Sequence, residues 1–371
     1  MSTIKKILID GTTISKKTDG LSQYIVNIIS HLQTDGFNYT LILRDEEYPE
    51  SFVKKIEERG IKIQKVKVQP IGPLRDIQFA LFLLRNRKKF DMTFIFSNQF
   101  PVFLNIPTIY TIHDLIYEEY PEQLGRFSKI KRLYLRFVVK IGIKKAKKII
   151  AVSDYTKSEI IRIHKPKDEQ KIVVIHEGWE HLRSDEILKK NPAPFGKYML
   201  YVGSSRKHKN IDKLLKAIQI IKEKLPKDYG FVFVGNTSFM NNEQKNSIAE
   251  MNKKRKIIHL TNWIEDSELA QYFKSANAFI FPSLSEGFGI PVLEAFYYKT
   301  PALLSNQASL PEVGGDAAIY FNPTDEKDIA EKIMYFIENE EEIHPALIEK
   351  GEKRLTQFSW KKAADEIITH I

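Results

Sequence analysis

Short runs of valine, isoleucine, leucine and phenylalanine recur along the whole chain, and longer segments of helical periodicity separate them. Most runs are apolar at successive positions rather than at alternate ones, which is typical of strands buried on both faces of a parallel sheet. The expected strands are residues 4–10, 39–43, 63–68, 92–97, 108–113, 148–152, 172–175, 199–203, 231–235, 257–260, 278–282, 302–305 and 318–321. The expected helices are residues 22–33, 127–146, 154–164, 211–224, 265–275, 325–338 and 358–371.

The repeated strand–helix units predict a doubly wound α/β architecture, and they fall into two sets. A polar segment at 179–197, which ends in NPAPFGK, separates the sets and is typical of a linker. We therefore expect one domain at 1–190 and a second at 191–357, facing each other across a central cleft. In open sheets of this kind ligands bind beyond the carboxyl ends of the strands, so the loops that follow strands should carry the function.

The length of 371 residues agrees with two domains, because a single hydrophobic core stops growing near ~250–300 residues. The content of 43% hydrophobic and 28% charged residues is that of a globular chain. The absence of cysteine excludes disulfide frameworks, thiolate metal sites and a cysteine nucleophile. No apolar run suits a signal peptide or a membrane span, so we expect an intracellular protein that is soluble or lies at a membrane surface.

The positive charge is distributed unevenly along the chain. The net charge of +10 falls within residues 1–180, whereas residues 181–371 are neutral. Residues 54–89 hold eleven cations and three acids, and residues 125–148 hold ten cations and no acid. Such segments bind anionic lipid with roughly 1 kcal/mol of favourable free energy per Lys or Arg near the surface. The other interpretation of these segments is a basic surface that is only solvated. Nucleic acid is a weaker candidate partner, because no nucleic-acid-binding motif accompanies the charge.

Within 125–148 the cations and the apolar residues occupy separate helical faces. The cations that recur every three or four residues are Lys129, Arg132, Arg136, Lys140 and Lys144. The apolar face, which we expect to lie in the core, holds Phe127, Ile130, Tyr134, Phe137 and Ile141. In the other basic segment, Phe79, Phe82 and Leu83 exceed what one buried helix face needs.

The segment 281–296, FPSLSEGFGIPVLEAF, combines a strand end, a glycine-bearing turn and the start of a helix. Gly287 and Gly289 let the backbone approach a ligand, and the free N–H groups of the helix start favour a phosphate. Glu286 and Glu294 would repel a phosphate, but they suit hydroxyl groups of a sugar and a ribose beside it. The spacing fits equally well a simple helix start with acidic residues in its first turn.

The loop after residues 199–203 presents cations at the same expected edge of the second sheet. Gly203 allows the turn, and Arg206, Lys207 and Lys209 follow it. A diphosphate carries roughly two negative charges and needs such cations. A solvated basic loop would have the same composition, but this loop stands where a ligand is expected.

In the first half, Asp-Gly at 10–11 ends a strand and Asp-Gly at 19–20 opens the next helix. This turn lacks the G-x-G-x-x-G pattern, which counts against a dehydrogenase. His113 stands at a strand end and is a candidate site residue, and the His-Glu-Gly at 176–178 is a weaker one. The nine histidines form no H-x-x-x-H pair and no Asp-x-Asp pair is present, so the sequence predicts no metal site.

With these motifs in order, the sequence resembles the retaining glycosyltransferases of family 4, also called glycosyl transferases group 1, which have the GT-B fold of two Rossmann-like domains. The signature is E-x7-E within EGFGIPVLEAF, at Glu286 and Glu294. Agreement extends along most of the chain, through ILIDG at 7–11, TIHDL at 111–115, IIAVSDYTKSEI at 149–160, YVGSSRKHKN at 201–210, FVFVGN at 231–236 and SLPEVGGDAAIYFNP at 309–323. The final segment 358–371 is similar to the helix that crosses back to the first domain in this fold.

The resemblance implies roles by position. Glu286 would contact hydroxyls of the donor sugar, with His113 beside that sugar, and Glu294 would hold the ribose. Arg206 and Lys209 would bind the diphosphate and offset the charge on the leaving group. The other implied nucleotide-sugar contacts are Gly20, Gly203, Gly235, Trp263, Ile264, Gly287, Phe288, Gly289 and Ile290.

The family's mechanism would be a substitution in which the acceptor hydroxyl attacks the face that the diphosphate leaves, and the departing phosphate takes the proton. Fixed cations and helix N–H groups would stabilise the leaving anion, so no metal and no other cofactor is expected. The chain departs from many relatives at Gly20-Leu21-Ser22 and at the segment 176–179, HEGW. Both departures concern the acceptor side more than the donor side.

We therefore expect a metal-independent hexosyltransferase that moves mannose from GDP-mannose to a lipid-linked or cell-surface polysaccharide acceptor, at the inner face of the cytoplasmic membrane. UDP sugars stay open as donors. One alternative is a nucleotide-sugar epimerase or a small-molecule glycosyltransferase of the same fold. Another is a membrane-binding or nucleic-acid-binding protein on an inactive scaffold, against which the intact Glu286, Glu294 and Lys209 argue.

Overall fold

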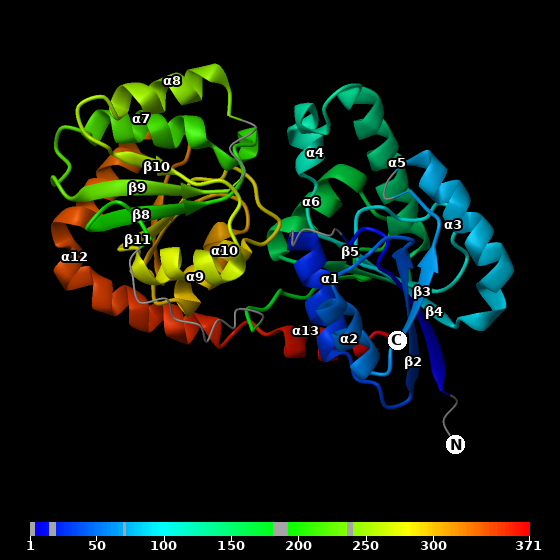
Figure 1. Ribbon diagram of the computed structural model, residues 1–371. Helices are drawn as coiled ribbons and strands as arrows, with labels where there is room; N and C mark the ends of the chain where they lie inside the picture. The colour runs from blue at the N-terminus through cyan, green and yellow to red at the C-terminus, as the bar shows by residue number, and fades with distance from the viewer. Residues whose placement is uncertain (1–3, 15–19, 70–71, 181–191, 236–239) are drawn as a thin grey trace. The chain divides into compact units, whose positions relative to one another are not determined.

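The computed structural model describes residues 4–14, 20–69, 72–180, 192–235 and 240–371 (Figure 1). The chain divides into two compact units, each of which is built on one parallel sheet. Unit 1 comprises Met1–Gly178 together with Ser359–Ile371, and unit 2 comprises Trp179–Phe358. No helix among the described residues has the length and apolar character needed to cross a membrane.

The sheet of unit 1 has the strand order β3-β2-β1-β4-β5-β6-β7. Its strands are β1 (Lys5–Asp10), β2 (Phe37–Arg44), β3 (Lys62–Val66), β4 (Met92–Ile95), β5 (Thr108–Ile112), β6 (Lys148–Ala151) and β7 (Ile172–Val174). Its α-helices are α1 (Gly20–His31), α2 (Glu50–Glu58), α3 (Pro73–Asn86), α4 (Ile116–Glu119), α5 (Ser128–Lys145), α6 (Asp154–His164) and α13 (Trp360–Ile368). The order reverses between β1 and β4, where Asp10 pairs with Ile42 on one side and Ile95 on the other.

The sheet of unit 2 has the order β10-β9-β8-β11-β12-β13. Its strands are β8 (Lys197–Val202), β9 (Tyr229–Val234), β10 (Ile258–Leu260), β11 (Ala278–Phe281), β12 (Ala302–Ser305) and β13 (Ala318–Phe321). Its α-helices are α7 (Ile211–Ile221), α8 (Asn242–Met251), α9 (Asp266–Ser275), α10 (Ile290–Tyr297), α11 (Leu310–Gly314) and α12 (Glu326–Leu355). Helices α7 and α8 lie on one face of the sheet, and α9 and α10 on the other (Figure 1).

Each expected strand is present, displaced by at most two residues at either end. The reason is that their apolar residues are buried on both faces, as in Met92–Ile95 and Thr108–Ile112, where every residue is buried. The doubly wound α/β architecture predicted from the sequence is confirmed in both units. Helix α12 extends seventeen residues beyond the expected end at 338 and contains Pro345 in its interior.

The segment after Phe358 belongs to unit 1 although unit 2 precedes it in the chain. Trp360 is fully buried there, and its ring meets the ring of Tyr24 edge to face at 5.6 Å. Ser359 caps α13 by accepting a hydrogen bond from the N–H of Lys362. Unit 1 therefore completes its core with residues that follow unit 2 in the chain.

The boundary expected at residue 190 lies outside the described residues. Trp179, which the sequence analysis placed in a linker, instead packs within unit 2. Its Nε1 donates to the carbonyl oxygen of Leu355 at 3.1 Å, and its ring lies 5.1 Å from the ring of Tyr297. The polar composition of the segment predicted a linker, and it gave no indication that Trp179 packs in unit 2.

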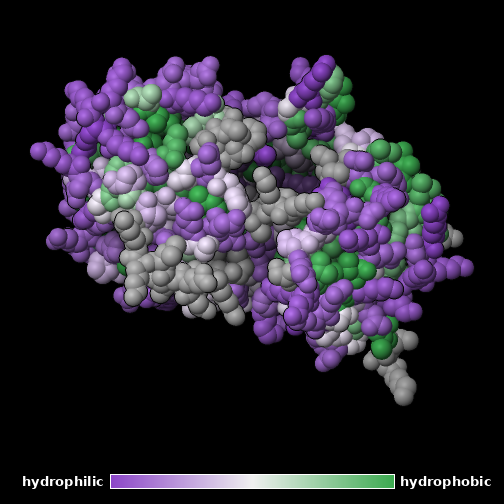
Figure 2. Space-filling view, viewed as in Figure 1, coloured by the Kyte–Doolittle hydropathy of each residue, from purple (hydrophilic) through white to green (hydrophobic). Residues whose placement is uncertain are grey.

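The expected core face of α5 is largely wrong. Ile130 and Phe137, with Phe127 at the N-cap, are more than half exposed, while Val138 and Val139 are buried instead. In α3, Phe79 and Leu83 were expected to be more than one buried face could hold, but both are buried. The exposed apolar residues of this helix lie at other positions. Figure 2 shows hydrophobic surface over both helices.

Candidate active site

The order of strands in unit 2 indicates where a ligand would bind. It reverses between β8 and β11, and in open parallel sheets ligands bind beyond the carboxyl edge at such a reversal. The loop after β8 carries Arg206 and Lys209, and the loop after β11 carries Glu286. These are three of the residues that the sequence analysis singled out.

Lys209 and Glu286 meet at this edge of the sheet. The Nζ of Lys209 donates to Oε1 of Glu286 at 2.6 Å, and it also lies 5.0 Å from the centre of the Phe281 ring. The side chain of Lys209 is 17% exposed and that of Glu286 is 11% exposed. A cation and a carboxylate are thus held together at the mouth of the site, both within reach of solvent.

The loop after β8 is held in place by Asn210. This residue adopts the left-handed conformation, with φ of 60°, and its buried Nδ2 donates to the carbonyl oxygens of Pro282 and Pro323. The N–H of Leu284 donates to the carbonyl oxygen of His208 at 2.7 Å. The two loops are therefore fastened to each other, which fixes the separation of Lys209 and Glu286.

His208 is buried between these charged residues. Burial lowers its pKa to about 4, and the positive charges of Lys209 and Arg206 act in the same direction against the opposing charge of Glu286. The imidazole is therefore neutral at physiological pH. Arg206 itself is exposed at the rim of the loop.

Ser309 fixes the turn at residues 286–288. Its Oγ lies 3.0 Å from the carbonyl oxygen of Glu286 and 2.7 Å from that of Phe288, and the side chain is fully buried. SLPE at 309–312 belongs to the resemblance, but the sequence indicates no role for Ser309. No local pattern links Ser309 to a carbonyl group 23 residues before it.

Helix α10 begins directly after this turn. Gly289 is its N-cap with φ of 111°, a conformation that favours glycine, and no side chain caps the helix. The first turn of α10 is therefore not closed by a capping side chain, and a helix start of this kind suits an anion. Phe288 is buried and Ile290 is half-buried, so their contribution to a ligand would come through the backbone.

Glu294 lies one turn further along α10 and is half-buried. Desolvation at this position, with the charge of Asp266 nearby, raises the pKa of Glu294 to about 7. A carboxyl group with such a pKa can both accept and donate a hydrogen bond near neutral pH. This is suitable for a pair of adjacent hydroxyl groups.

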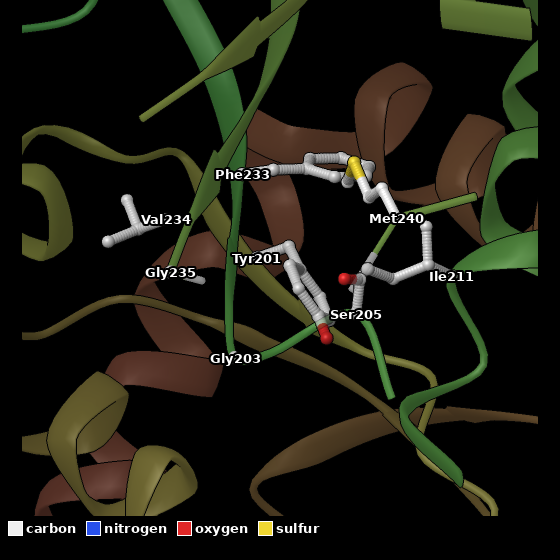
Figure 3. A pocket seen from close by; sticks show the side chains of 8 residues that line it. All are labelled: Tyr201, Gly203, Ser205, Ile211, Phe233, Val234, Gly235 and Met240. Carbon is white, nitrogen blue, oxygen red and sulfur yellow. The ribbon is translucent and has the colours of Figure 1, made fainter. Parts of the chain in front are cut away.

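Gly203 and Gly235 end β8 and β9 in direct contact. A Cβ added to Gly235 would lie 2.1 Å from the carbonyl oxygen of Gly203, and Gly235 has φ of 136°. Beside them is a small pocket with an empty volume of about 170 Å³, part of it open to solvent (Figure 3). It is lined by Tyr201, Gly203, Ser205, Ile211, Phe233, Val234, Gly235 and Met240.

The remaining predicted contacts are not joined to this cluster by the contacts described. Trp263 is 52% exposed after β10, and Ile264 beside it is half-buried. Gly20 is the first residue of α1 in unit 1, and an added Cβ would meet nothing within 4 Å. The residues at 19 and 236, which belong to two quoted motifs, lie outside the described residues.

His113 lies at the carboxyl end of β5 in unit 1 and is fully engaged. Its Nε2 lies 3.1 Å from the carbonyl oxygen of Phe96, and its Nδ1 lies 3.3 Å from Oε1 of Glu177. The ring of Tyr24 packs edge to face on the imidazole at 4.5 Å. Glu177, which the sequence favoured only weakly, is thus the buried partner of His113.

The reversal point of unit 1 is filled by a side chain. Arg75 of α3 is fully buried and is paired with Asp10 at the end of β1. Its Nη1 donates to the carbonyl oxygen of Gln99, beyond β4, at 2.9 Å. A lone charge pair of this kind gave no signal in the sequence, because Arg75 stands within an apolar helix.

Two family models match consecutive parts of the chain. Glycosyltransferase Family 4 matches residues 18–181, and glycosyl transferases group 1 matches residues 184–354. The chain belongs to the family-4 glycosyltransferases. The GT-B fold that the resemblance implied is confirmed by a crystal structure of Anabaena Alr3699/HepE in complex with UDP and glucose, with a TM-score of 0.74, 16% identity and 98% of both chains covered.

Two curated glycosyltransferases are similar in sequence. O-antigen chain mannosyltransferase B of Escherichia coli is 29% identical over 70% of this chain and 68% of its own length. O-antigen chain mannosyltransferase RfbU of Salmonella typhimurium is 33% identical over 58% of this chain, and the match spans 57% of that protein. Both relatives are named as mannosyltransferases of an O-antigen chain.

Proposed function

We propose that this glycosyltransferase moves mannose from GDP-mannose to a lipid-linked or cell-surface polysaccharide acceptor, with retention of configuration at the anomeric carbon. The observation that carries the proposal is the pairing of Lys209 with Glu286 where the strand order of unit 2 reverses. The names of the relatives, which are O-antigen mannosyltransferases, support mannose and a polysaccharide acceptor.

The residues of unit 2 suit the two halves of a nucleotide sugar. Lys209, with Arg206 at the rim and the N–H groups at the start of α10, would hold the diphosphate and stabilise its charge as it leaves. Glu286 would accept hydrogen bonds from the sugar, and Glu294 from the ribose. The pocket beside Gly203 and Gly235 is too small to hold a nucleotide.

The proposed reaction is a single substitution at the anomeric carbon. The bond between the anomeric carbon and the diphosphate oxygen breaks, and a bond from that carbon to the acceptor oxygen forms on the same face. The proton of the acceptor hydroxyl passes to an oxygen of the departing phosphate. Cations of the protein take the electrostatic role that a metal has in other transferases, so the proposed reaction needs no metal ion.

The proposed place of reaction is the inner face of the cytoplasmic membrane. An acceptor carried on a lipid would be reached there, and the net charge of +10 within residues 1–180 would attract anionic lipid. Peripheral attachment agrees with the finding that the described helices are unsuited to span a bilayer.

The test is transfer from defined donors in the presence of EDTA. The purified protein is incubated with GDP-mannose, UDP-glucose or dTDP-rhamnose and a lipid-linked oligosaccharide, and the product linkage is assigned by NMR. The proposal expects an α-mannoside from GDP-mannose with EDTA present. In a separate thermal denaturation experiment, stabilisation of the protein by UDP or dTDP but not by GDP would contradict GDP-mannose as the donor. A β-linked product would contradict retention of configuration.

A further inference from the structure

Two helices of unit 1 expose eight large apolar side chains. On α3 these are Leu74, Ile77, Leu81 and Leu84, between 51% and 66% exposed. On α5 and its N-cap they are Phe127, Ile130, Leu133 and Phe137, between 54% and 66% exposed. Single exposed apolar residues are common, but two continuous stripes form a patch of the kind that binds a partner. We call these eight residues the α3–α5 patch (Figure 2).

The exposure of α3 is enforced from inside the molecule. A surface helix ordinarily turns its charged residues to solvent, but α3 buries both of its charged residues in its first turn, Arg75 and Asp76. Arg75 is paired with Asp10 of β1, and Oδ2 of Asp76 accepts from Tyr134 at 2.7 Å. These buried bonds fix the rotation of the helix, so its aliphatic stripe faces outward.

The bond from Tyr134 to Asp76 also joins α5 to α3, which makes the two stripes neighbours. Exposed cations surround them: Arg85, Lys88, Lys89, Arg126, Lys129, Lys131, Arg136, Lys140 and Lys144. Neither helix carries an exposed acid, because α5 has none and the acid of α3 is buried. Glu118 of α4 pairs with Arg132 and Arg136 on α5, and the other cations leave the surface both apolar and positive overall.

This combination selects one occupant. A second copy placed on the patch by two-fold symmetry would bring like charges together across the interface, which is unfavourable. A nucleic acid would satisfy the cations but would leave the aliphatic side chains without an apolar partner. An anionic bilayer matches both features, since acyl chains lie below a layer of negative phosphates.

We propose that the α3–α5 patch inserts into an anionic lipid bilayer, with its apolar side chains among the acyl chains and the surrounding lysines and arginines at the level of the phosphates. The inference deepens the proposed function, on which it rests for the lipid-linked acceptor. It differs from attraction by charge alone in one measurable respect, because apolar insertion is not screened by salt.

The experiment is vesicle sedimentation with phosphatidylcholine vesicles that contain phosphatidylglycerol, at low salt and at about 1 M NaCl. The test variant combines L81Q, L84Q, I130Q and F137Q, and the matched control combines I220Q and Y335Q, which replace side chains of 50% and 48% exposure in unit 2. The wild type and the control should keep measurable binding at high salt. The test variant should bind at least about tenfold more weakly at low salt and lose binding at high salt.

A second measurement protects the result from a folding defect. Tryptophan introduced as I130W should shift its emission to shorter wavelength on vesicle addition, whereas I220W should not. Equal sedimentation of test variant and wild type, no binding by the wild type, or a wild-type dimer that the test variant abolishes would each overturn the proposal. Calorimetry with GDP and UDP in the absence of lipid separates this failure from failure of the proposed function, because the nucleotide residues lie in unit 2.

Discussion

The Nζ of Lys209 lies 2.6 Å from Oε1 of Glu286. The cation that suits a phosphate is thus bonded to the carboxylate that suits a sugar. A donor that binds as proposed must separate them, with Lys209 turning to the diphosphate and Glu286 to the sugar hydroxyls. A nucleoside diphosphate without its sugar would release Lys209 and leave Glu286 with no compensation. The pair therefore favours the intact donor over the spent product.

This relationship predicts opposite effects of one substitution. E286Q should bind GDP or UDP about three- to tenfold more tightly, because Lys209 no longer loses an ionic partner, and it should lose most transfer activity. K209A should lose both. Isothermal titration calorimetry measures the first effect and product formation the second.

A matched control is E326Q, which breaks the pair of Glu326 with Lys213 at 2.5 Å elsewhere in unit 2. Its nucleotide affinity should equal that of the wild type. Weaker binding of GDP and UDP by E286Q would show that the pair does not compete with the diphosphate.

The contact of Gly235 with Gly203 predicts a loss of stability on adding one methyl group. G235A places Cβ 2.1 Å from a backbone oxygen at φ of 136°, so the free energy of unfolding should fall by about 2–4 kcal/mol. G20A, where an added Cβ meets nothing within 4 Å, should change stability by less than about 0.5 kcal/mol. Urea denaturation measures the free energy of unfolding of both variants. An unchanged value for G235A would contradict the described contact of Gly235 with Gly203.

The raised pKa of Glu294 predicts a pH-dependent gain from removing its charge. Because the pKa is about 7 in the folded protein and the ordinary value is 4.5, stability falls as pH rises between these values and stays reduced above pH 7. E294Q should therefore be more stable than the wild type by about 1–3 kcal/mol near pH 8, with little gain near pH 5. Denaturation at both pH values is the measurement, and an equal difference at the two would refute the shift.

The two contacts of His113 predict its tautomer. A carbonyl oxygen only accepts hydrogen bonds, so Nε2 must carry the hydrogen that is donated to Phe96, while Nδ1 faces Glu177. E177Q can donate to a neutral Nδ1 and should keep the ring in place, whereas E177L should cost about 1–3 kcal/mol. Long-range ¹H–¹⁵N NMR reports the tautomer, and a wild-type ring protonated at Nδ1 alone would be inconsistent with these contacts.

The strands and their loops were predictable from the sequence because parallel strands carry a strong local signal. An uninterrupted apolar run such as Met92–Ile95 is buried on both faces whatever its neighbours are. Since chemistry collects at strand ends, Glu286 and Lys209 followed from the positions of the strands and the resemblance. Their direct pairing did not, because it depends on Asn210 fastening two loops that are 72 residues apart.

The burial of Arg75 and Asp76 in α3 could not be predicted, and the reason is physical. Helical periodicity identifies an apolar face and assigns it to the core. It does not show that Asp10 is buried beneath the helix and pairs with Arg75. Once Arg75 turns inward, every other position on the helix turns with it. The same limit applies to Glu177 and Ser309, whose roles arise from partners far away in the chain.

The return of α13 to unit 1 bears on how the protein is made. Unit 2 is one continuous segment and can fold as soon as it leaves the ribosome, whereas unit 1 lacks Trp360 until the residues that follow unit 2 have been synthesised. The half of the chain that is made first is thus the last to be finished. Until then the nascent protein lacks the packing of Trp360 on Tyr24, and a stop codon before residue 360 would leave that side of the core uncovered.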